Sequence, residues 1–190
     1  MVKNKKAQLI IFFIIALVIV IIIIFGYLAF YNYQKYQTKK EQEINNIISF
    51  MDICHENSIK VVIFLISFGG YYETPEYATE YGIPYYFIGE KNLTPSLEQI
   101  EKEIEKGLKN EFLFCLNNFS AFNKSSFKII PEELNTSVSI EKEGINLEIN
   151  YKLKVVWQDN RINIINYNKK NIIKVKFMDI YNLATKITNE

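Results

Sequence analysis

The two cysteines, Cys54 and Cys115, are the residues whose chemistry is easiest to specify. In an oxidising compartment, such as the space outside a cell, two cysteines that come together form a disulfide. This bridge would close a loop of about 60 residues, for which chain-entropy estimates give about 4 kcal/mol of stabilisation. In a reducing compartment the same residues would be two buried thiols. Both interpretations stay open at this point, because they depend on where the domain lies.

The other reactive side chains form no catalytic pattern. The only histidine, His55, has no second His or Cys at metal-ligand spacing. The acidic residues between positions 98 and 105 alternate with lysines, as on a solvated helix face. The sequence contains no Gly-rich phosphate loop, CxxC or HExxH motif. We therefore predict a protein that is not an enzyme and that needs no metal or other cofactor.

Two further sets of residues are candidate surface sites. Residues 71–94 form an irregular, Tyr-rich segment, and a loop of this length inside a compact domain is often functional. Clustered tyrosines are typical of recognition surfaces, although the rings could instead fold back as a lid on the core. The possible partner-binding residues are Tyr71, Tyr72, Tyr77, Tyr81, Tyr85 and Tyr86. Asn-x-Ser/Thr sequences mark possible glycosylation at Asn92, Asn118, Asn123 and Asn135.

An apolar segment near the N-terminus determines where the rest of the chain lies. Residues 9–31 carry no charge, and as a helix they would span about 35 Å, enough to cross a hydrocarbon core of about 30 Å. A cleavable secretory signal would have a shorter apolar core. Lysines flank the N-terminal end closely, which favours the N-terminus inside and the domain outside. We predict a basic leader (1–8), a transmembrane helix (9–31), a stalk (32–43) and an extracytoplasmic domain (44–190).

The domain itself is predicted to be α+β. Apolar residues recur at helical spacing from Ile44 to Leu65, which predicts that the transmembrane helix continues into an amphipathic helix that ends at Gly69 and Gly70. A second helix is expected from Thr94, as its N-cap, to about Asn118. A short C-terminal helix over 179–187 is expected to pack its apolar residues, which are Ile180, Leu183 and Ile187.

Between these helices the hydrophobic period changes to two. Residues 145–157 alternate apolar and mostly polar side chains, as a half-buried strand does. Further strands are predicted at 134–141, 161–167 and 171–177. The short links between them favour antiparallel hairpins. We therefore expect a meander of about four strands with one face covered by helices.

The N-terminus also carries a family resemblance. Lys5-Lys6-Ala7-Gln8, followed directly by the apolar run, resembles the processing site of archaeal type IV pilin precursors. The resemblance implies cleavage between Ala7 and Gln8, and a retained helix that anchors the subunit and can form the core of a filament. The rest of the chain is similar to membrane-anchored surface proteins of archaea that share this pilin-like start.

These observations lead to one functional expectation and two alternatives. The first is a non-enzymatic, single-pass protein of the cell membrane, with its C-terminal domain outside, that serves in adhesion, envelope organisation or protein assembly. Its partners would be the lipid bilayer and either another protein or further copies of itself. Nucleic acid is excluded as a partner because 22 basic and 21 acidic residues nearly cancel. The alternatives are a pilin-like filament subunit, and a membrane-tethered enzyme or solute-binding module.

Overall fold

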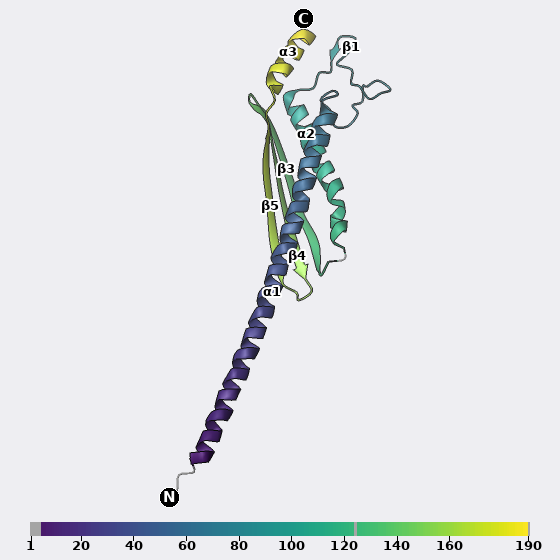
Figure 1. Ribbon diagram of the computed structural model, residues 1–190. Helices are drawn as coiled ribbons and strands as arrows, with labels where there is room; N and C mark the ends of the chain where they lie inside the picture. The colour runs from purple at the N-terminus through teal and green to yellow at the C-terminus, as the bar shows by residue number, and fades with distance from the viewer. Residues whose placement is uncertain (1–4, 124, 190) are drawn as a thin grey trace. The chain divides into compact units, whose positions relative to one another are not determined.

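The structure is a computed structural model that describes residues 5–123 and 125–189 (Figure 1). The chain divides into two compact units, residues 1–49 and residues 50–190, and each is described by itself. We call the second unit the head domain. Residues 1–4 of the predicted leader lie outside the described residues. The predicted cleavage pair, Ala7 and Gln8, lies in the first turns of helix α1, and its side chains are not among those described.

The first unit consists of the N-terminal part of α1, which spans Lys5–Ile66. From Ile14 to Phe30 every side chain is exposed, around the whole circumference of the helix. A helix with this composition satisfies its backbone polar groups internally and presents only apolar surface, which is what a hydrocarbon environment requires. Among the described residues, this one helix is long and apolar enough to cross a membrane.

In the head domain, the last part of α1 is amphipathic. Its buried stripe includes Met51, Cys54, Val62 and Ile66. The helix then ends as predicted, because Gly70 adopts a positive φ of 79° and its N–H donates to the Ile66 carbonyl oxygen at 2.7 Å. Glycine takes this left-handed conformation without the steric cost that a Cβ would add.

The core of the head domain is a three-stranded antiparallel sheet. Strands β3 (Phe127–Glu141), β4 (Gly144–Trp157) and β5 (Ile162–Ile173) pair in the order β3-β4-β5. The alternation predicted for β4 is confirmed, since every odd-numbered residue from Ile145 to Trp157 is buried. Helices and a sheet buried on one face confirm the predicted α+β class.

The prediction of about four strands is wrong in two places. The two strands predicted at 161–167 and 171–177 are one strand, β5, because its alternation continues through Lys169 and Lys170. These lysines looked like a turn but reach carboxylates on opposite sides of the sheet: Lys169 meets Asp52 at 3.0 Å and Lys170 meets Glu148 at 3.1 Å. Strand β3 begins before the predicted residue 134, because a bulge between Pro131 and Leu134 lets an edge strand include proline.

Helix α2 (Leu97–Leu116) begins later than predicted. Its N-cap is Ser96, not Thr94, and the Ser96 Oγ accepts a hydrogen bond from the Gln99 N–H at 3.2 Å. The helix ends where Asn117 takes a left-handed conformation, and a 3-10 segment, η1 (Asn117–Phe122), follows. The buried face of α2 packs toward the sheet through residues such as Phe112, whose ring lies 6.0 Å from that of Tyr151.

Helix α3 (Phe177–Asn189) lies at the same end of the head domain as the Tyr-rich segment (Figure 1). The predicted packing face is wrong, because Ile180, Leu183 and Ile187 are all exposed. The helix is held by its other side, where the Tyr181 hydroxyl donates to the Pro95 carbonyl oxygen at 3.0 Å. Helical spacing identified one apolar face, but it could not show whether that face meets the core.

Candidate functional site

The Tyr-rich segment is fastened to α2 at its beginning. The Tyr72 N–H donates to Glu103 Oε2 at 3.1 Å, and the Tyr72 hydroxyl donates to Glu111 Oε1 at 2.9 Å. Lys106 forms an ion pair with Glu73 at 2.6 Å. The absence of a side chain at Gly107 lets the Tyr72 ring lie against the helix backbone. These contacts fix the first residues of the segment, so the remainder starts from a defined position.

The remainder has little secondary structure. An isolated bridge joins Ala78 and Pro84, and a small hairpin pairs β1 (Phe87–Ile88) with β2 (Lys91–Asn92). Four of the six predicted tyrosines are exposed, with Tyr81 at 83% of its full accessibility. Tyr71 and Tyr72 are partly buried. The segment therefore presents most of its rings to solvent and uses Tyr72 as its anchor.

The tyrosines at the base of the segment stay protonated at neutral pH. Burial and the neighbouring Glu111 carboxylate raise the pKa of Tyr72 to about 12. Burial also raises the pKa of Tyr71 and of Tyr86 above the ordinary value. A neutral phenol can donate and accept hydrogen bonds, and its ring adds apolar contact area.

An open cleft of about 480 Å³ lies between the Tyr-rich segment and the start of α2. Two of its carboxylates are engaged: Glu73 with Lys106, and Glu103 with the Tyr72 N–H. The cleft is lined by Tyr71, Glu73, Tyr77, Tyr85, Thr94 and Glu103, among others. The Thr94 Oγ1 is buried and has no hydrogen-bond partner in the described chain. No Ser, Cys or His is among the described residues that line the cleft.

A second polar cluster lies under α1 in the head domain. Asp52 accepts a hydrogen bond from the Tyr167 hydroxyl at 3.0 Å and pairs with Lys169, as described above. The ring of His55 meets that of Tyr167 edge-on, with centroids 6.5 Å apart, and its Nε2 is buried without a partner. Burial and the nearby Lys169 lower the pKa of His55. This cluster joins α1 to β5.

The sequence did not predict either set of anchoring contacts. Tyr72 and Glu111 are 39 positions apart, and Asp52 and Tyr167 are 115 positions apart. One contact could have been inferred if β5 had been known to continue through residue 169. Lys169 would then have been placed on the buried face of the strand, where a lysine needs a carboxylate partner.

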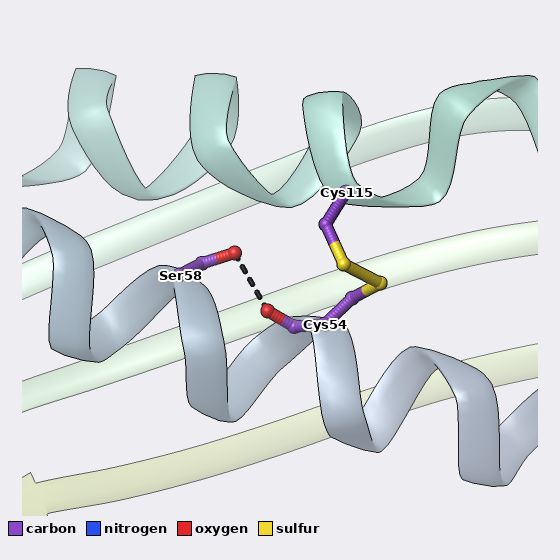
Figure 2. Close-up of a disulfide and its surroundings, with 3 residues drawn as sticks. All are labelled: Cys54, Ser58 and Cys115. Carbon is purple, nitrogen blue, oxygen red and sulfur yellow. Dashed lines mark hydrogen bonds between the residues drawn. A yellow bond between two sulfur atoms is a disulfide. The ribbon is translucent and has the colours of Figure 1, made fainter.

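Cys54 and Cys115 form a disulfide, with their Cα atoms 5.5 Å apart (Figure 2). Figure 2 shows the bridge joining α1 to α2 in front of the strands, near Ser58, whose hydroxyl donates to the Cys54 carbonyl oxygen at 2.7 Å. Of the two alternatives that the sequence left open, the structure has the disulfide. The bridge ties together the two helices that cover the sheet.

The four predicted glycosylation residues lie at the surface. They are Asn92 in β2, Asn118 in η1, Asn123 after it and Asn135 in β3, and all four are exposed. Lys124, the middle residue of one acceptor sequence, lies outside the described residues. Exposure permits attachment of a glycan but does not distinguish these residues from other surface asparagines.

Metal binding has no evident site in the part of the chain that the structure describes, where no group of three or more His, Cys, Asp and Glu side chains is placed to hold an ion. Comparison with models of protein families, with curated proteins and with solved structures finds no match.

Proposed function

We propose that the protein is a non-enzymatic, single-pass membrane protein whose head domain works on the outer face of the cell. The observation that carries the proposal is the combination of an apolar N-terminal helix with a disulfide in the domain that follows it. Disulfides persist outside the cell and are rare in the cytosol. The lysines before the apolar segment favour the same orientation.

The role within this proposal is adhesion, envelope organisation or assembly with partner proteins. It is supported by the exposed tyrosines of residues 71–94, which are held on a segment fixed to α2. Exposed, preorganised aromatic rings are typical of protein recognition, because little side-chain freedom is lost on binding. The partner would then be a protein surface that accepts rings such as those of Tyr81 and Tyr85.

Protease treatment of intact cells that produce the protein tests the orientation. A C-terminal epitope tag should be removed without breaking the cells. A tag that survives until the cells are opened would place the head domain in the cytoplasm and end the proposal. A cytoplasmic protein carrying the same tag is the matched control for cell integrity.

A variant with Tyr81→Ala and Tyr85→Ala tests the recognition surface. Both rings are exposed, so the unfolding temperature should stay within about 2 °C of the wild type. Crosslinking on intact cells should then recover less of any partner that the wild type recovers reproducibly. A variant that loses stability instead would show that these rings pack on the domain.

The second candidate is a pilin-like filament subunit. It is favoured by the continuity of α1, which runs without a break from Lys5 to Ile66 and so leads from the apolar segment into the head domain. A mature protein that begins at Gln8, recovered from filaments sheared off the cells, is the expected result. An intact N-terminus on the native protein would exclude this candidate and leave the first one in place.

A further inference from the structure

The two edge strands of the sheet, β3 and β5, differ in what covers their outer edges. The edge of β3 is met by α2, where the Ile140 N–H donates to Glu101 Oε1 at 2.7 Å. Strand β5 is the last strand on the other side, and Figure 1 shows it as the outermost strand of the sheet. Within the described chain, no strand or side chain bonds to the outer edge of β5 from Asn163 to Ile173. A strand of 12 residues with a free edge can pair with another chain.

The hairpin register shows which residues of β5 serve the free edge. The Trp157 N–H donates to the Arg161 carbonyl oxygen at 3.0 Å, so this pair is hydrogen-bonded. In an antiparallel ladder, hydrogen-bonded pairs alternate with pairs that are not bonded to each other. The odd-numbered residues of β5 therefore bond to β4. The even-numbered residues, from Ile162 to Ile172, direct their N–H and carbonyl groups to the free edge.

The order of residues along β5 is nearly palindromic about Tyr167. Tyr167 is flanked by Asn166 and Asn168. The next two positions are Ile165 and Ile164 on one side and Lys169 and Lys170 on the other. Beyond them Asn163 matches Asn171, and Ile162 matches Ile172. We propose that the free edge of β5 pairs with the β5 edge of a second copy of this chain, antiparallel and centred on Tyr167.

In this register the free N–H and carbonyl groups of the even-numbered residues face those of the second copy. It places Ile162 opposite Ile172 of the second copy, Asn166 opposite Asn168, and Ile164 opposite Lys170. These residues are all even-numbered, so each opposed pair can exchange both hydrogen bonds, giving about twelve across the interface. The exposed side chains of Ile162 and Ile172 then cover each other, and the amides of Asn166 and Asn168 can bond to each other.

The charges of β5 do not oppose this pairing. Lysine on an edge strand normally blocks the approach of another strand. Here Lys169 is paired with Asp52 and Lys170 with Glu148, at 3.0 Å and 3.1 Å. In the proposed register each of these lysines also faces an isoleucine of the second copy instead of another lysine. A register that placed Lys170 opposite Lys170 would be disfavoured, because like charges would face each other across the strands.

The pairing goes beyond the proposed function and does not depend on it. The pairing uses the sheet edge and not the Tyr-rich segment, and it is independent of which side of the membrane carries the head domain. A head domain found in the cytoplasm would therefore not contradict the β5 pairing. A chain that does not pair through β5 would not contradict the outside location. Because the pairing is antiparallel, it turns the second copy end over end, so the head-domain parts of the two α1 helices run in opposite directions.

Two double variants of the full chain in detergent micelles test the pairing by sedimentation and light scattering. Asn166→Lys with Asn168→Lys puts like charges opposite each other in both symmetry-related pairs, and should raise the dimer dissociation constant by about tenfold or more. Asn166→Glu with Asn168→Lys puts opposite charges there and should remain dimeric. Ser137→Lys, on β3 at the same open face of the sheet, is the matched control and should behave as the wild type.

Each variant is first shown to be folded by its unfolding temperature. A wild-type dimer that only the Lys/Lys variant dissociates supports the pairing. A wild type that stays monomeric would overturn it and leave the edge to a strand of another protein. A dimer that the Lys/Lys variant does not weaken would place the contact elsewhere, and loss of the dimer in both double variants would overturn the register.

Discussion

Gly107 is the position at which the anchoring of the Tyr-rich segment can be tested most sharply. It lies in the interior of α2 and is buried. Replacing an interior helical glycine by alanine ordinarily stabilises a protein by about 0.5–1 kcal/mol, because alanine loses less backbone freedom on folding. At Gly107 the added Cβ would lie 2.7 Å from Cδ2 and 3.0 Å from Cγ of Tyr72. The ring must therefore move.

The ring cannot move without losing other contacts. The Tyr72 hydroxyl is held by Glu111 and its N–H by Glu103. Losing one such hydrogen bond costs about 1 kcal/mol, and forcing extra volume into a packed contact costs about 1–3 kcal/mol. We expect Gly107→Ala to lower the free energy of unfolding by about 1–3 kcal/mol, after allowance for the helix propensity that it gains.

A double-mutant cycle with Tyr72→Ala isolates this contact. In the Tyr72→Ala background the ring is absent, so Gly107→Ala should raise the free energy of unfolding by about 0.5–1 kcal/mol. The change of sign between the two backgrounds is the prediction. Denaturant unfolding in micelles, followed by the fluorescence of Trp157, measures it, since Trp157 is the only tryptophan and is buried in the head domain. A Gly107→Ala chain as stable as the wild type would refute the anchoring of Tyr72 on α2.

The same unfolding assay checks three further predictions. Replacing both Cys54 and Cys115 by alanine should lower the free energy of unfolding by about 4 kcal/mol, because the bridge closes a loop of 61 positions; a loss under about 1 kcal/mol would contradict this. The lowered pKa of His55 means that the unfolded chain binds the proton first as the pH falls below 6.5, so stability should decline through that window, and by less in His55→Gln. An equal decline in both chains would contradict burial of neutral His55. Leu153→Ala should cost about 2–5 kcal/mol because Leu153 is fully buried, whereas Lys152→Ala, on the opposite face of β4, should cost under about 1 kcal/mol, and similar losses would contradict the assigned faces.

The sequence predicted the elements whose patterns depend on burial alone. The apolar run before residue 31 and the strict alternation in β4 each predicted an element from the spacing of apolar residues within one segment. The end of α1 was predicted for a different reason, because Gly70 supplies a backbone conformation that few residues adopt. These are local requirements, and the residues that meet them are adjacent in the chain.

The elements that the sequence predicted poorly depend on residues distant in the chain. Lys169 resembled part of a turn because its carboxylate partner, Asp52, belongs to another element. The strand predicted at 134–141 began too late, because the pairing of Pro131 with Leu153 becomes apparent only once β3 is known to be an edge strand. The apolar face of α3 was taken as buried because amphipathicity does not show which side meets the core.

The candidate site follows the same division. Composition identified the Tyr-rich segment, and the structure adds how its base is fastened. Tyr72 was one of six tyrosines in the sequence, and only its hydrogen bonds to α2 distinguish it as the anchor. The exposed rings, which are those of Tyr77, Tyr81, Tyr85 and Tyr86, are the ones that the proposed recognition would use.

The redox state of Cys54 and Cys115 in the native protein tests whether the head domain carries its internal disulfide and lies outside the cell. Cells are opened in the presence of a thiol-alkylating reagent, and the intact mass is measured before and after reduction. We expect an unalkylated protein that gains about two mass units on reduction, one hydrogen for each sulfur. A protein alkylated at both cysteines before reduction would instead place the head domain in a reducing compartment, because its thiols would be free.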